Sequence, residues 1–250
     1  MKKRIIALTT ATLALTISYN ANAGWLDDIK GAAKEVAGTD GTEITKSALS
    51  NSDVVSGLKE ALANGVESAI STLGTSGGFL NNSAVKIAVP DSLKSVATTA
   101  RTLGQGEYVD SLETTMNQAA EQAVPEAAEI LSDAIREMSV EDAMNILNGP
   151  DDAATQYFRK VSEASLTEKF KPIVSQATDK TRVTASYKNL TSQAKPMLGA
   201  VMDDSSLDLD QYVTNKSLDG LFKYIAVEEK SIRENPAART SDMLKTVFGD

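Results

Sequence analysis

Few residue types in this chain could carry out chemistry, because it contains no histidine and no cysteine. Histidine is the commonest proton carrier near neutral pH, and histidine and cysteine are the usual ligands of structural zinc. Catalytic dyads and triads built on either residue are therefore excluded. No glycine-rich loop matches a phosphate-binding pattern, and we expect no cofactor. What remains is the chemistry of carboxylates, of serine–lysine pairs and of oxygen ligands for calcium or magnesium.

The best carboxylate candidates are Asp151 and Asp152, which follow a tight Asn-Gly-Pro turn and begin a predicted helix. Exposed amides and the helix dipole favour negative charge at that position. One interpretation is a small acidic site, with Thr155 and Arg159 one and two turns further along the helix. The alternative, which we favour, is ordinary capping followed by a solvated stripe of charge.

Tyr157 and Arg239 complete the candidate ligand-binding set, and Arg239 lies in a predicted turn at residues 235–240 where it could pair with a carboxylate. A structural purpose is the simpler interpretation of that turn. A hard cation could be wrapped by four nearby acids, Asp203, Asp204, Asp208 and Asp210. They do not match the EF-hand loop, so a solvated loop that caps the next helix is the favoured alternative and we assign no metal ligand.

Apolar residues at helical spacing provide a third candidate, a cavity between helices for a lipid or another apolar molecule. Plain core packing is the commoner role of such residues, and it is the default here. The residues concerned are Met116, Met138, Met144, Phe158, Phe170 and Phe222.

The start of the chain resembles a secretory signal peptide. Lys2, Lys3 and Arg4 precede a short apolar run, and small residues follow at Ala21 and Ala23. The run is too short for a permanent anchor, so we expect cleavage after Ala23 and a periplasmic protein. Residues 1–23 are then the signal peptide, 24–50 a flexible leader and 51–250 a helical domain.

The charge balance argues against nucleic acid as a partner. The chain has 25 basic and 34 acidic residues, a net charge of −9. Cleavage removes three basic residues, which leaves 22 against 34 and a net charge of −12. Nucleic acid and anionic lipid bind positive charge, and no basic stripe stands out. No later segment is apolar for long enough to span a membrane stably.

Apolar spacings of three and four residues predict an all-α fold, a single compact domain of about nine helices. The clearest stripe follows an N-cap at Ser52 or Asp53 and consists of Val54, Leu58, Leu62, Val66, Ile70 and Leu73. Residues 83–89 alternate in polarity and form at most one short extended segment. Ser139 with Asp142, and Ser165 with Glu168, have capping-box spacing and predict that helices begin there. Further helices are expected over 183–194 and 243–248.

Several separated segments, in order, resemble the bacterial domain of unknown function 4197 family. They include residues 79–82, 123–127, 138–143, 149–159 and 235–240, and the resemblance covers roughly residues 50–249. It implies an exported helical protein of Gram-negative bacteria. It implies no particular activity and no catalytic residues that could be carried over.

Two functional hypotheses follow from these features. The leading one is a non-enzymatic periplasmic module that binds an envelope protein or an apolar ligand. The alternative is a carboxylate-based hydrolase or cation-dependent enzyme with a site near Asp151, Asp152 and Arg159. A deep pocket that joins these three residues would favour the enzyme, whereas a closed apolar cavity or an exposed apolar patch would favour the binding module.

Overall fold

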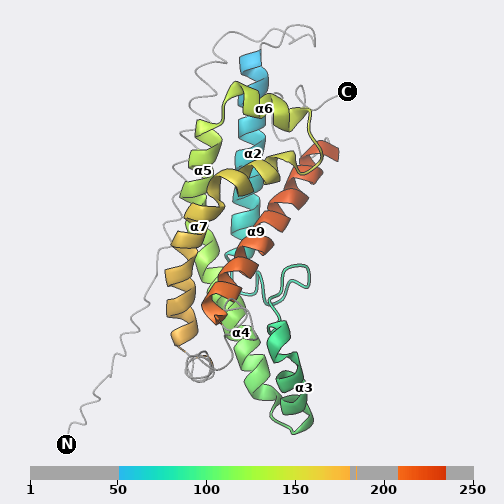
Figure 1. Cartoon of the computed structure of the whole chain (residues 1–250). Helices are drawn as coiled ribbons and strands as arrows, with labels where there is room; N and C mark the ends of the chain where they lie inside the picture. The colour runs from blue at the N-terminus through green and yellow to red at the C-terminus, as the bar shows by residue number, and fades with distance from the viewer. Residues whose placement is uncertain (1–50, 181–183, 185–207, 235–250) are drawn as a thin grey trace, which may run out of the picture.

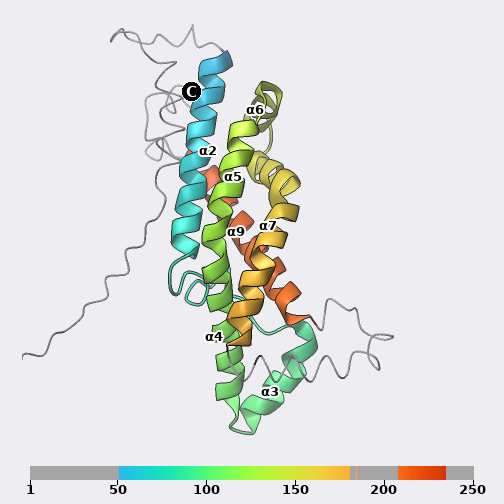
Figure 2. The ribbon, with the colours of Figure 1, turned by 90° about the vertical axis from the view of Figure 1, so that its left-hand side faces the viewer.

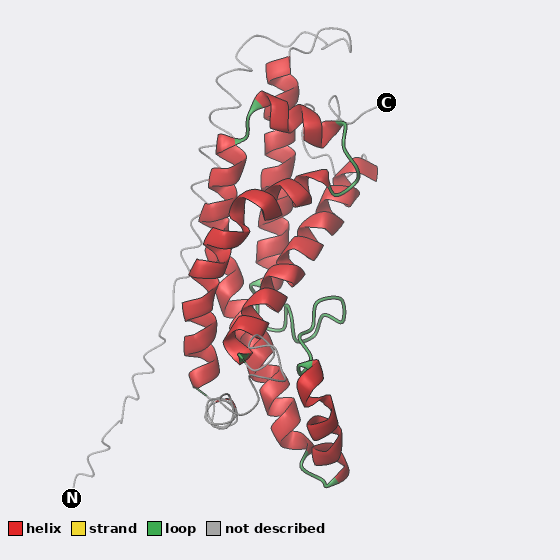
Figure 3. Cartoon of the chain, in the orientation of Figure 1, coloured by secondary structure: helices red, strands yellow, loops and turns green. Residues whose placement is uncertain are grey.

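The computed structural model describes residues 51–180, 184 and 208–234, and all regular structure within these ranges is helical (Figure 3). The predicted all-α fold class is therefore confirmed for the described residues. The α-helices are α2 (Asn51–Leu73), α3 (Lys94–Thr102), α4 (Gly106–Ala123), α5 (Ala127–Glu137), α6 (Val140–Leu147), α7 (Ala153–Asp179) and α9 (Leu209–Glu234). Two short 3-10 helices, η1 (Asp91–Leu93) and η2 (Val124–Glu126), precede α3 and α5.

These helices form an elongated bundle around one apolar core (Figures 1 and 2). The two longest, α7 and α9, pack antiparallel. Lys171 donates a hydrogen bond to Gln211 near one end of the pair, and Thr155 bonds to Glu229 near the other. Both views show α3 and the start of α4 projecting beyond the ends of α7 and α9. None of the described helices has the combination of length and apolarity that crossing a membrane requires.

The predicted apolar stripe of α2 faces the core. Leu58, Leu62, Val66 and Leu73 are buried, while the stripe residues Val54 and Ile70 are partly exposed. The helix ends at the predicted glycines. Gly77 has a φ of +86°, a left-handed conformation that side chains with a Cβ adopt at a cost.

The segment expected to be extended at residues 83–89 is so only in part, because residues 83–85 form a turn in which the Val85 and Lys86 N–H groups bond to the Asn82 carbonyl. It forms no strand, although Val85, Ile87 and Val89 are buried and the residues between them are exposed. A side chain takes the place of a neighbouring strand. The buried Asn117 accepts from the backbone N–H of Ile87 at 2.8 Å and donates to its carbonyl oxygen at 2.8 Å. One extended segment can be buried alone in this way because its backbone groups find partners on α4.

One turn along α4, Glu121 holds the loop that precedes this segment. Its Oε1 atom accepts from the N–H groups of Phe79 and Leu80 at 3.0 and 3.1 Å. The Phe79 ring is buried against Gly220 of α9, where an added Cβ would lie 2.6 Å from a ring carbon. α4 and α9 thus enclose the loop between α2 and α3.

The expected count of about nine α-helices is not met in the described residues, which contain fewer. The sequence predicts a new helix at Ser165, but α7 is continuous from Ala153 to Asp179. No glycine interrupts the chain there, and the buried stripe of Phe158, Leu166 and Phe170 continues through the expected boundary. The helices expected over 183–194 and 243–248 lie outside the described residues, Thr184 apart.

Candidate functional site

A carboxylate from α9 caps the start of α7. Glu229, which is 4% exposed, accepts from the backbone N–H of Ala154 at 2.9 Å and of Thr155 at 3.0 Å. It also accepts from the Thr155 hydroxyl at 2.9 Å. Free amides and the helix dipole make a helix N-terminus attractive to an anion. Glu229 supplies that anion from α9.

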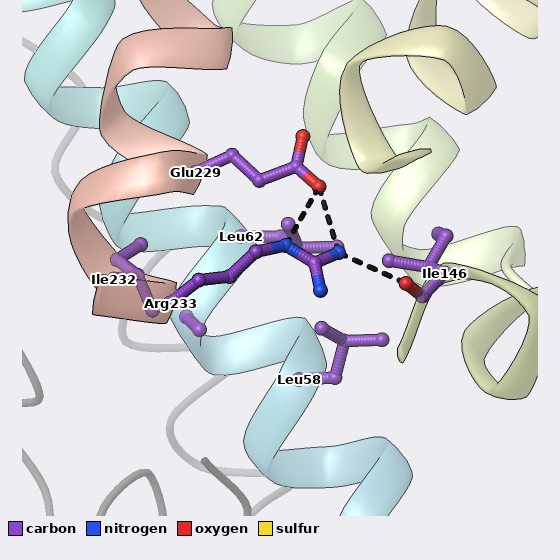
Figure 4. A pocket seen from close by; sticks show the side chains of 7 residues that line it. Leu58, Leu62, Ile146, Glu229, Ile232 and Arg233 are labelled. Atoms are coloured by element: carbon purple, nitrogen blue, oxygen red, sulfur yellow. Dashed lines mark hydrogen bonds and ion pairs between the residues drawn. The ribbon is translucent and has the colours of Figure 1, made fainter. Parts of the chain in front are cut away.

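Arg233, one turn along α9, completes this arrangement (Figure 4). Its Nη2 atom lies 2.9 Å from Glu229 Oε1 and donates to the carbonyl oxygen of Ile146 at 2.9 Å. Ile146 belongs to the last turn of α6, where carbonyl groups lack partners within the helix. Glu229 and Arg233, which we call the α9 clasp, therefore join the end of α6 to the start of α7.

A small pocket lies against this clasp, with a cavity volume of about 10 Å³. Figure 4 shows its apolar wall, which includes Leu58, Leu62, Ile146 and Ile232. That volume holds about one water molecule. A lipid or another apolar ligand does not fit there.

The residues expected to line an apolar cavity belong to the core instead. Of the six, Met144 is partly exposed and the other five are at most 3% exposed. Such low exposure is expected for side chains that pack closely between helices, which was the default interpretation.

The candidate acids Asp151 and Asp152 both face solvent. Asp152 occupies the N-cap position of α7 but makes no capping hydrogen bond, so the expectation that it caps this helix is wrong. Its side chain instead accepts from the Gln156 amide at 2.8 Å. Asp152 does not cap the helix because Glu229 already accepts from the backbone N–H groups of Ala154 and Thr155, which a capping side chain would bond.

Arg159 and Tyr157 are engaged with neighbouring helices. The Arg159 guanidinium pairs with Glu163 and with Asp219 of α9, each at 3.1 Å, and lies 4.6 Å from the centre of the Phe222 ring. Tyr157 donates its hydroxyl to the Ala134 carbonyl of α5 at 3.2 Å. Burial raises the pKa of Tyr157, and nearby negative charge adds to this effect.

The structure thus brings only Thr155 of the candidate set to the α9 clasp, while Arg159 joins a separate contact between α7 and α9. Arg239 lies outside the described residues. Asp203 and Asp204 do as well, but Asp208 accepts from the Gln211 N–H at 3.0 Å and so caps the start of α9. Within the described ranges, no three acidic side chains converge as metal ligands would.

A family model described as protein of unknown function (DUF4197) matches residues 48–249. The chain belongs to the DUF4197 family. Neither the curated proteins nor the solved structures include a match to this chain.

Two of the segments that carry the family resemblance, residues 138–143 and 149–159, have structural roles in this DUF4197 member. Ser139 and Asp142 form the predicted capping box at the start of α6, with the Ser139 hydroxyl accepting from the Asp142 N–H at 3.0 Å. The segment at residues 149–159 supplies the amides that Glu229 binds, the ring of Phe158 in the core and the bridging Arg159. The contacts of residues 149–159 join α7 to other helices of the bundle.

Sequence reasoning missed the buried polar residues that organise the fold. Glu229 occupies the position four residues after the buried Ile225, so it continues the apolar stripe of α9. Asn117 and Glu121 likewise lie on the core side of α4. A polar residue in register with a buried stripe was the available signal, since such a residue needs a partner inside the protein.

Proposed function

We propose that this DUF4197 protein is exported to the periplasm and acts without catalysis, by binding a protein partner of the cell envelope. The basic, apolar and small-residue pattern of the first 23 residues supports export. The observation that carries the binding role is the exposure of Leu103 and Tyr108, which are 70% and 63% exposed. Both lie at the tip of the projecting pair α3 and α4.

We call residues 94–110 the α3–α4 arm. Few of its side chains are buried in the core, and most are exposed where a partner protein could contact them. Ala97 is buried, but Thr98, Thr99 and Thr102 are exposed and donate their hydroxyl groups to carbonyls of the same helix. These bonds leave the arm's threonines with few free donors, and its exposed charges are balanced, with Lys94 and Arg101 against Glu107 and Asp110. Exposed aromatic groups surrounded by polar and charged residues are typical of protein interfaces, whose rims are polar.

A protein partner is better supported than an apolar ligand. The pocket at the α9 clasp has a volume of about 10 Å³, and one side of it is the ion pair of Glu229 and Arg233. Desolvating such a pair against a lipid chain is unfavourable. The exposed apolar groups lie on the outside, where another protein can cover them.

The carboxylate-based hydrolase has weaker support. Asp151 and Asp152 are exposed, and Arg159 is already paired with Glu163 and Asp219. Thr155 donates to Glu229. A catalytic acid or base needs a pocket that positions a substrate beside it, and no described pocket joins these residues.

Site-specific photo-crosslinking in intact cells tests the proposal. A photoreactive residue at Leu103 or Tyr108 should form adducts with one defined envelope protein. The matched control is the same residue at Glu67, an exposed position on α2, which should form no such adduct. Equal adducts at all three positions, or none at Leu103 and Tyr108, would contradict a partner at the arm.

A further inference from the structure

Two asparagine residues of the chain are followed directly by glycine. The pair Asn148–Gly149 closes α6, and the pair Asn64–Gly65 lies in the middle of α2. Glycine has no Cβ, so its backbone nitrogen can approach the side-chain carbonyl carbon of the preceding asparagine with little obstruction. Attack by that nitrogen on the carbonyl carbon is the first step of deamidation. The two pairs are therefore the best candidates for this modification.

The surroundings of Asn148 leave it able to react. It is exposed and occupies the C-cap position of α6, with a ψ of −1°. At this angle the Gly149 nitrogen points away from the Asn148 Cγ atom, so the main chain must rotate before the two can meet. The Gly149 N–H bonds to the Ile146 carbonyl at 3.2 Å, at the long end of the range for such bonds. The Asn148 amide also releases its bond to the Met144 carbonyl, which is 2.8 Å long. The rotation thus disturbs only the end of a helix.

The surroundings of Asn64 prevent the same rotation. Helix α2 continues on both sides of the pair, so the Gly65 N–H bonds to the carbonyl of Ala61 within the helix. Gly65 is buried, and an added Cβ would lie 3.5 Å from Glu228 Cβ and from Ile232 Cδ1 of α9. Bringing the Gly65 nitrogen to the Asn64 side chain would require α2 to unwind against α9.

We propose that Asn148 is a site of spontaneous deamidation and that the fold directs this reaction to Asn148 and away from Asn64. The Gly149 nitrogen gives up its proton and forms a bond to the Asn148 Cγ atom. The bond from Cγ to the side-chain nitrogen breaks, and that nitrogen takes up a proton and leaves as ammonia. Water then opens the resulting succinimide ring at either carbonyl. The products are aspartate and isoaspartate, in which the main chain runs through Cγ. This inference does not depend on the proposed binding role.

Both products change the turn between α6 and α7. A negative charge at the C-terminus of α6 is unfavourable with the helix dipole, and Asp151 and Asp152 lie just beyond it in the sequence. Isoaspartate also lengthens the main chain where space is short. A Cβ added at Gly149 would lie 2.7 Å from Ala153 Cβ and 2.8 Å from the Asn145 carbonyl oxygen. Deamidation should therefore loosen the junction that the α9 clasp holds.

The α9 clasp restrains the reactive turn. Arg233 donates to the Ile146 carbonyl oxygen at 2.9 Å, and this is the same oxygen that accepts from the Gly149 N–H (Figure 4). By fixing the acceptor, Arg233 helps to keep the Gly149 nitrogen in place. We infer that loss of Arg233 speeds the reaction at Asn148 and leaves Asn64 protected by α2.

Peptide mapping by mass spectrometry tests the proposal on the purified protein. The folded chain is held in mildly alkaline buffer, which speeds loss of the Gly149 amide proton, and samples are digested at intervals. Aspartate and isoaspartate should accumulate at residue 148 while Asn64 stays intact. In concentrated urea, which unfolds α2, both pairs should react at similar rates.

A pair of variants tests the role of the clasp. Arg233→Gln should speed the reaction at Asn148 by about fivefold, the effect of losing one hydrogen bond, and should leave Asn64 intact. The matched control is Arg101→Gln, at an exposed position on α3 at the other end of the bundle, which should change neither rate. If Arg233→Gln prevents folding, Arg233→Lys replaces it, because lysine keeps the positive charge and gives up the planar fork.

The proposal is overturned if Asn148 stays intact in the folded chain over the time in which the chain in urea reacts. Equal rates at Asn148 and Asn64 in the folded chain would overturn it as well, since the fold would then direct nothing. A folded Arg233 variant that reacts at the parent rate would overturn the restraint by the clasp.

Discussion

Replacing Glu229 with glutamine should be the most damaging conservative change in the described part of the chain. The carboxylate accepts three hydrogen bonds from the start of α7 and further bonds from Arg233. Glutamine keeps the shape but turns one acceptor atom into a donor. In either orientation, its NH₂ group would face other N–H donors, and Arg233 would lose its counter-charge.

The size of the effect follows from these contacts. Loss of a helix cap costs about 1 kcal/mol, and breaking a buried ion pair by removing one partner costs about 3–5 kcal/mol. Arg233 keeps its bond to the Ile146 carbonyl and 16% of its side chain is exposed, which favours the lower part of that range. We expect Glu229→Gln to lower the free energy of unfolding by about 4 kcal/mol.

Urea denaturation followed by circular dichroism measures this loss. With a slope near 2.5 kcal/mol/M, typical of a domain of this size, the midpoint should fall by about 1.5 M. The matched control is Glu228→Gln, at the neighbouring position, where the carboxylate accepts from the Ser68 hydroxyl and is partly exposed. That variant should lose less than about 1 kcal/mol. Equal losses in the two variants, or a loss below about 1 kcal/mol for Glu229→Gln, would refute the assigned role of the clasp.

Three other substitutions have expected outcomes that the same denaturation experiment can measure. Gly220→Ala should destabilise the protein by about 1–2 kcal/mol, since the Phe79 ring would have to move; a more stable variant would contradict this contact. Thr214→Val should raise stability by about 1 kcal/mol, because the Thr214 hydroxyl is buried without a hydrogen-bond partner; a loss would reveal a missed partner. Bonds from Ser139 lower the pKa of Asp142 below its usual 3.8, so its stabilising effect is complete above that value and lost as pH falls through the folded-state pKa. The stability difference between the parent protein and Asp142→Asn should therefore shrink below pH 3.8, and a difference that persists at lower pH would contradict the cap.

Local patterns predicted the elements that depend on nearby residues. The stripe of α2, its glycine stop and the capping box of Ser139 and Asp142 each involve contacts within a few residues, and the structure contains all three. The extended segment was also predicted as a lone element. This segment can be buried because Asn117 bonds the backbone of Ile87, and these two residues are 30 positions apart in the sequence. Local spacing carries no information about such a partner.

The errors have the same origin. The sequence placed a helix start at Ser165 because its spacing to Glu168 suits a capping box, but burial of Leu166 and Phe170 favours a continuous α7. Asp152 was expected to cap α7 because it is adjacent, yet Glu229, 74 residues beyond Thr155, holds the amides. In both cases a tertiary contact outweighed a local preference.

We propose that this protein binds another protein and neither holds a small ligand nor carries out a reaction. Native mass spectrometry of the protein, released gently from the cells that produce it, tests this proposal most directly. We expect a complex whose extra mass is that of a defined polypeptide, and replacing Leu103 and Tyr108 with serine should abolish it. A monomer that retains a lipid or metal mass, with no polypeptide partner, would contradict the claim.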